Sequence, residues 1–86
     1  MHKAIFMADK KSILIKFGNH VRKLRKDKKL SQDKVASNSS TLTKATVSDI
    51  ENGKRNPEFT TIVDLAYGIG VALTELVDYQ IVREEE

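Results

Sequence analysis

Residues 30–57, LSQDKVASNSSTLTKATVSDIENGKRNP, decide the fold of this chain. Ser31 is placed to cap a helix, because a serine oxygen accepts hydrogen bonds from the free backbone N–H groups at a helix start. The polar run at residues 37–41 predicts a turn. Thr43 is placed to cap the next helix, which we expect to end near Gly53, since glycine tolerates the left-handed backbone after a helix. The stretch therefore predicts two short helices joined by a polar turn.

Apolar residues at helical spacing predict three further helices on either side. The first runs from Ile13 to Lys29, and Gly18 inside it indicates that another helix approaches closely. Gly70 ends the fourth helix, whose first turn accommodates Pro57. We expect this helix to be well buried through Phe59, Ile62, Val63, Leu65, Ala66 and Ile69, and a short fifth helix to carry Leu73, Leu76 and Val77. The fold class is all-α, a compact bundle of five short helices.

The composition indicates one soluble, cytoplasmic domain. Eighty-six residues suffice to bury a core, and the absence of cysteine excludes disulfides and thiolate metal sites. No apolar run approaches the roughly 20 residues of a membrane span. Residues 1–55 hold fourteen Lys and Arg against five Asp and Glu, whereas residues 56–86 hold one against seven. This asymmetry favours a polyanionic partner for the first part of the chain.

Catalysis is not expected. His2 and His20 are the only histidines, and neither has a carboxylate at a catalytic or metal-ligand spacing. We interpret both histidines as surface residues. The four glycines are separate and form no phosphate-binding loop. We therefore predict no enzyme activity, no metal site and no cofactor.

The helix after Thr43 has the character of a helix that reads DNA. At about 100° per residue, Val47 and Ile50 form an apolar edge for the core. The opposite arc carries short polar or small side chains, which allow a helix to enter a major groove about 12 Å wide. Their donor and acceptor groups suit base edges, so we predict base contacts from Lys44, Ala45, Ser48 and Asp49.

Phosphate contacts are expected from the residues that flank this arc, since helix starts, amides and cations all bind the DNA backbone. The predicted set is Gln32, Thr43, Thr46, Asn52, Lys54 and Arg55. Lys23, Arg25 and Lys26 are expected to face solvent.

Three segments together resemble the phage repressor, Cro and xenobiotic-response-element family of helix-turn-helix regulators. They are Phe17-Gly18 to Arg25, Leu30-Ser31-Gln32-Asp33 to Ala36, and Thr46-Val47-Ser48 to Pro57. Leu65-Ala66 to Leu76 resembles the last two helices of that family. The resemblance implies a lambda-repressor-like domain over about residues 13–78, a homodimer on a double-stranded DNA operator, and transcriptional regulation, most simply repression. It also implies that Glu51 is structural and pairs with Arg25 or Arg22.

The resemblance leaves residues 1–12 as an N-terminal arm and residues 79–86 as an acidic tail. We predict a dimer interface from Leu76, Val77, Tyr79 and Ile81. Two alternatives remain open. The same fold serves as an antitoxin or adaptor that binds an unidentified protein partner, and a controller protein of a restriction–modification operon has similar size and architecture.

Overall fold

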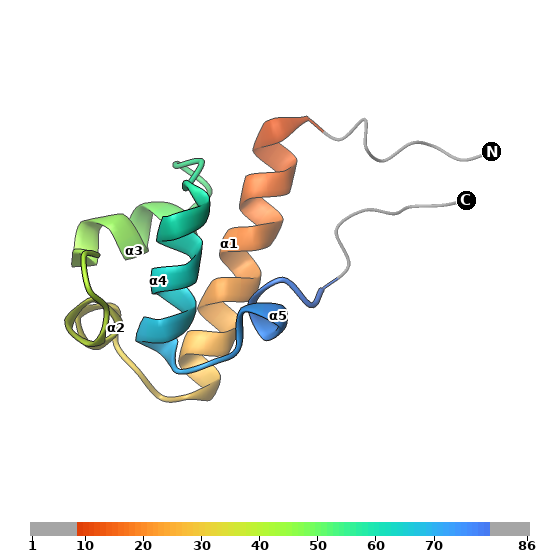
Figure 1. The fold of residues 1–86 in the computed structure, drawn as a ribbon. Coiled ribbons are helices and arrows are strands. Elements are labelled where there is room, and N and C mark those ends of the chain that lie inside the picture. The colour runs from red at the N-terminus through yellow and green to blue at the C-terminus, as the bar shows by residue number, and fades with distance from the viewer. Residues whose placement is uncertain (1–8, 80–86) are drawn as a thin grey trace.

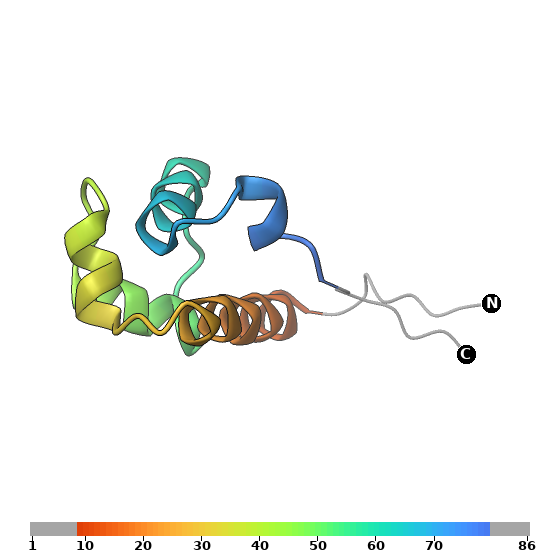
Figure 2. The ribbon, with the colours of Figure 1, turned by 90° about the horizontal axis from the view of Figure 1, so that it is seen from below.

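The computed structural model describes residues 9–79, which form five helices and no strand. They are α1 (Lys10–Asp27), α2 (Gln32–Asn38), α3 (Lys44–Glu51), α4 (Phe59–Ile69) and α5 (Leu73–Leu76). The predicted all-α class is therefore confirmed. The helices form two layers, with α1 and α3 on one side, α4 and α5 on the other, and α2 at one end (Figures 1 and 2).

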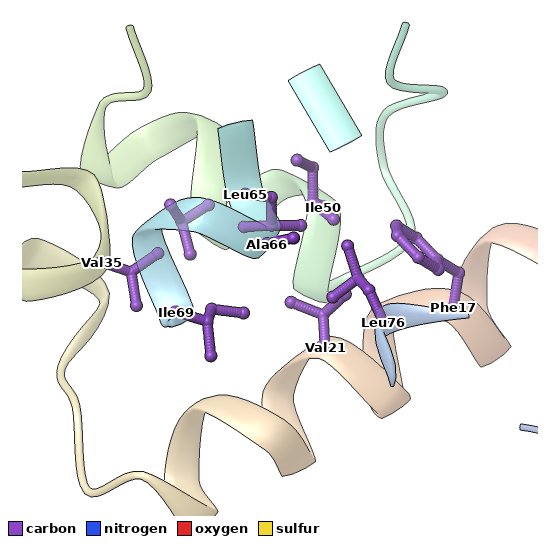
Figure 3. Close-up of a cluster of buried hydrophobic side chains, with 9 residues drawn as sticks. Phe17, Val21, Val35, Ile50, Leu65, Ala66, Ile69 and Leu76 are labelled. Carbon is purple, nitrogen blue, oxygen red and sulfur yellow. The ribbon is translucent and has the colours of Figure 1, made fainter. Parts of the chain in front are cut away.

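Side chains from all five helices fill the space between the layers (Figure 3). Val21 of α1, Val35 of α2 and Leu65 of α4 have no exposed surface. Val47 and Ile50 of α3 lie in the same core, as their angular position on the helix predicts. Helix α3 is thus held by its apolar edge, which leaves its opposite face outside the core.

The caps follow the sequence closely. The Ser31 side chain accepts from the Lys34 N–H, and the Thr43 side chain accepts from the Thr46 N–H. Gly53 and Gly70 have positive φ of 70° and 88° just after α3 and α4, in the left-handed region that favours glycine. These local signals explain why the two helices of the 30–57 stretch begin where the sequence predicts.

Three predicted boundaries were wrong. Helix α1 begins at Lys10 instead of Ile13, because the Asp9 side chain accepts from the Ser12 N–H and caps it. Residues 10–12 therefore belong to the helix and not to an arm. Helix α2 continues to Asn38, so part of the predicted turn is helical. Pro57 precedes α4, whose N-terminal cap position is Glu58.

Helix α4 is less buried than predicted. Phe59 is 67% exposed and Val63 is 43% exposed, although the sequence placed both in the core. The reason is angular, since these two residues and Tyr67 recur every four positions along one edge of the helix. Leu65, Ala66 and Ile69 lie on another edge and face the core. The exposed edge is an apolar stripe on the surface of the domain.

Gly18 permits the close approach of α1 to the end of α3, as predicted. A Cβ atom at this position would meet the carbonyl oxygens of Ile50 and Glu51, the latter at 2.5 Å. Backbone atoms cannot yield as a flexible side chain can. A side chain at residue 18 would therefore push α1 away from α3.

We predict that Gly18→Ala destabilises the domain by about 1–3 kcal/mol, the usual cost of forcing extra atoms into a packed contact. The better helix propensity of alanine offsets only about 1 kcal/mol of the clash. The free energy of unfolding in urea, followed by circular dichroism, measures the effect. Asn19→Ala, at the exposed neighbouring position, is the control and should be nearly neutral. Equal stability of both variants would show that α1 and α3 can separate freely.

Candidate DNA-binding surface

The outward face of α3 is formed by the residues that the sequence predicts to read bases. Lys44 and Ala45 are exposed, whereas Ser48 and Asp49 are half-buried. Thr43 and Thr46 lie at the start of the helix, where their hydroxyl groups are 3.0 Å apart. Asn52, Lys54 and Arg55 are exposed just beyond its end. The structure thus gathers the predicted residues of this segment around one helix, and their contacts with DNA stay predictions.

A buried carboxylate fixes the end of α3 against α1. The Glu51 side chain has no exposed surface, and its Oε2 accepts from Arg25 Nε at 2.6 Å. Its Oε1 accepts from Arg25 Nη2 at 2.9 Å and from Arg22 Nε at 3.3 Å. The pairing implied by the family resemblance is therefore confirmed for both arginines. A buried charge is costly unless it is paired in this way.

Arg25 does not face solvent, contrary to the sequence prediction. Its side chain is 11% exposed, and Nη1 also donates to the Leu30 carbonyl at 2.9 Å. The hydrogen bonds to Glu51 raise the pKa of Arg25 above its ordinary value. Arg25 was predicted to face solvent because other basic residues surround it in the sequence. Its buried partner, Glu51, lies 26 positions away. Spacing within α1 cannot reveal that partner.

Gln32 also donates to the Glu51 carboxylate, so that Glu51, Arg22, Arg25 and Gln32 form one group, the Glu51 cluster. Gln32 Nε2 donates to Glu51 Oε1 at 2.9 Å, which ties the start of α2 to the end of α3. An amide nitrogen carries two hydrogens, so one remains to donate elsewhere. The predicted phosphate contact by Gln32 would therefore come from a side chain whose orientation Glu51 already sets.

Helix α4 holds the turn between α2 and α3, a feature that the sequence did not predict. Asp64 Oδ1 accepts from the Ser40 N–H at 2.8 Å, and Oδ2 accepts from the Thr41 N–H at 2.8 Å and the Thr41 hydroxyl at 2.9 Å. The backbone hydrogen bond from Ser40 is the main cause that lowers the pKa of Asp64. Asp64 is the one charged residue in the otherwise uncharged α4. This isolation is the only signal in the sequence that marks it.

The predicted dimer residues divide into three groups. Leu76 has no exposed surface and packs in the core, so its side chain cannot meet a second protomer and this prediction is wrong. Val77 is 49% exposed, and Tyr79 is half-buried against Phe17 and His20. Ile81 lies outside the described residues.

His20 has a more defined place than a plain surface residue. Its Nε2 lies 2.9 Å from the Glu75 carbonyl oxygen, and its ring lies 4.6 Å from that of Tyr79 between centroids. These contacts attach the end of α5 to α1. His20 therefore has a structural role in positioning the segment that carries Val77.

Other kinds of site find little support between residues 9 and 79. No three His, Asp or Glu side chains in this range are grouped as a metal site requires. None of the helices in the described range combines the length and apolar character needed to cross a membrane.

The comparisons with known proteins agree with this geometry. Residues 21–76 match the family model described as "Helix-turn-helix". The chain is 43% identical over 65 residues to Control protein C.MunI of Mycoplasma sp, covering 74% of this chain and 86% of that protein. It is 37% identical over 60 residues to the uncharacterised helix-turn-helix regulator y4dJ of Sinorhizobium fredii, covering 70% and 77%.

Two solved structures share the fold. The restriction-modification controller protein C.AhdI from Aeromonas hydrophila superposes with a TM-score of 0.74 at 37% identity, covering 79% of this chain and 97% of that one. The clp gene regulator ClgR from C. glutamicum gives a TM-score of 0.69 at 17% identity, covering 76% and 83%. The predicted lambda-repressor-like fold is thereby confirmed.

We predict that the domain loses stability in acid and that Glu51 contributes to this loss. Burial raises the pKa of this carboxyl, but the hydrogen bonds from Arg25, Gln32 and Arg22 outweigh burial and lower it below its ordinary 4.5. A carboxyl whose pKa is lower in the folded state stabilises the fold above its unfolded pKa. That stability is lost as the pH falls through the folded value. The free energy of unfolding in urea should therefore decline below about pH 5.

Glu51→Gln should reduce this pH dependence and cost about 3–5 kcal/mol at neutral pH, because it leaves two arginines without their buried counter-charge. Glu58→Gln is the matched control, since Glu58 is exposed and makes no capping hydrogen bond. If Glu51→Gln does not fold at neutral pH, the importance of the charge is shown directly. An unchanged acid dependence in a folded Glu51→Gln would assign it to other carboxyls.

Proposed function

Because the chain belongs to the helix-turn-helix family of Cro/C1-type transcriptional regulators, we propose that it is a controller protein of a restriction–modification operon. The observation that carries the proposal is the similarity to two controller proteins over 86% and 97% of their own lengths. This was the second of the two alternatives left open by the sequence. The family is one of DNA-binding, non-enzymatic regulators.

We place α3 in the major groove of a double-stranded operator. Its outward side chains are short except for Lys44, so the helix can approach base edges closely. Lys44 suits guanine O6 and N7, Ala45 suits the thymine methyl, and Asp49 suits the cytosine amine. Ser48 has a hydroxyl that pairs with any base unless its environment restricts it.

The DNA backbone would be held at both ends of this helix. Thr43 and Thr46 supply donors at its start. Gln32 lies beside Glu51 at its other end, where Asn52, Lys54 and Arg55 supply a further amide and two cations. The Glu51 cluster supports this arrangement, since it joins Gln32 to the end of α3 before any DNA is bound.

A homodimer would place two copies of α3 on a two-fold operator. We propose that the contact between protomers lies after α5, at Val77 and the neighbouring Tyr79, with Ile81 in continuation. Half-exposed Val77 is an apolar group that a partner can cover. The contact of Tyr79 with His20 and Phe17 would make this surface rigid.

Selection from randomised duplex DNA by the purified protein should yield a two-fold motif with half-site centres about one helical turn apart. A controller protein requires that this motif also precede its own gene or an adjacent restriction gene, where footprinting should detect it. Arg55→Ala is the control, because a lost phosphate contact lowers affinity for every sequence and leaves the motif unchanged. A motif found only before unrelated genes would refute the controller role. No enrichment would refute sequence-specific binding.

Val77→Asp should weaken dimerisation, since a charge would be buried between protomers. Sedimentation velocity over a range of protein concentrations measures the shift toward monomer. Val63→Asp is the matched variant, as it places the same charge on the exposed apolar stripe of α4. If Val63→Asp alone produced monomers, the interface would lie on α4 and not after α5.

A further inference from the structure

We propose that Arg22 and Asn52 fix the hydrogen-bonding polarity of Ser48, so that Ser48 presents a donor to the DNA. The ligand for this hydroxyl is then an acceptor on a base edge, which is guanine O6 or N7, adenine N7 or thymine O4. The inference rests on the proposed placement of α3 in the major groove. It adds a series of contacts that determines specificity, from Arg22 on α1 through Asn52 to Ser48 on α3.

The first contact sets the orientation of the Asn52 amide. Arg22 Nη2 lies 3.0 Å from Asn52 Oδ1 and 3.4 Å from the Glu51 carbonyl oxygen, while Arg22 Nε donates to the Glu51 carboxylate. A guanidinium group can only donate hydrogen bonds. The Asn52 side chain must therefore turn its oxygen toward Arg22. Because Glu51 holds the guanidinium, this orientation is set before DNA binds.

The second contact makes the Ser48 oxygen a hydrogen-bond acceptor within the protein. With its oxygen on Arg22, Asn52 directs its Nδ2 toward Ser48 Oγ, at 3.4 Å. Asn52 lies one helical turn after Ser48, so their side chains share one edge of α3. An amide NH₂ group only donates, and the Ser48 oxygen is consequently the acceptor in this pair. The single hydroxyl hydrogen of Ser48 must point elsewhere.

No acceptor within the described part of the chain receives that hydrogen from Ser48. The hydroxyl is half-buried on the outward arc between exposed Ala45 and Asn52. A free hydrogen at this position matches a base acceptor in the groove. Cytosine offers only its N4 donor in the major groove. A contact with N4 through the second lone pair of Ser48 would leave the hydroxyl hydrogen unpaired, so cytosine should be disfavoured where Ser48 contacts the operator.

Asn52→Asp tests the direction of the chain with little change in shape. Both oxygens of aspartate accept, so one stays on Arg22 and the other now accepts from the Ser48 hydroxyl. Ser48 then has no hydroxyl hydrogen left for a base acceptor, and both of its lone pairs can accept from a base amine. At the base pair that Ser48 contacts, preference should move from an acceptor base to cytosine by about threefold to tenfold, the range expected for one hydrogen bond.

The readout is the ratio of affinities for duplexes that differ at one base pair, measured at fixed salt. The added negative charge weakens binding to all duplexes, but it cancels in this ratio. Ser48→Ala identifies the base pair, because it should relax preference at one position of each half-site. The double variant Ser48→Ala/Asn52→Asp should show no movement toward cytosine. Asn52 is exposed at the end of α3, so the substitution leaves the core intact.

Two results would overturn the inference in different ways. If Ser48→Ala relaxes one position but Asn52→Asp leaves its preference unchanged, the contact chain does not set the polarity, while the proposed function stands. If Ser48→Ala alters no position although the selected motif remains, Ser48 does not read a base and the inference falls with that placement.

Discussion

The buried carboxylate of Glu51 is the interaction on which the arrangement of α1, α2 and α3 depends. The Glu51 side chain has no exposed surface, and its donors come from Arg22 and Arg25 on α1 and Gln32 on α2. A charge in this position is costly unless every donor is present. The need to pair this buried charge therefore fixes the positions of the helices as well as contributing to stability. The observed placement of the three helices brings all of these donors to one carboxylate.

The same cluster joins folding to DNA recognition. Arg22 reaches past Glu51 to Asn52, and Gln32 donates from the first turn of α2. Both Gln32 and Asn52 belong to the proposed DNA-binding surface. The conformational entropy of these two side chains is therefore lost on folding and not on binding, which lowers the entropy cost of forming the complex. A preformed surface of this kind favours discrimination between bases, because its donors and acceptors cannot rearrange to suit a wrong sequence.

Much of the fold was predictable because its signals are local. Ser31, Thr43 and Gly70 lie where caps and helix ends need those residue types, and the apolar edge of α3 follows from its angular spacing alone. Features that depend on distant partners were missed. Arg25 was placed in solvent, and Leu76 on a surface, because neither sequence neighbourhood reveals what lies across the core. The pairing of Glu51 came from the family resemblance and not from its own surroundings in the chain.

The turn between α2 and α3 depends on a residue that follows it by more than twenty positions. Asp64 receives the backbone N–H groups of Ser40 and Thr41, so an exposed loop has its amides directed into a carboxylate on another helix. Opening of this loop requires the loss of the three hydrogen bonds that hold it to α4. Movement of the turn is therefore coupled to α4. Fluctuations that would change the angle between α2 and α3 are limited by these bonds as well as by the length of the loop.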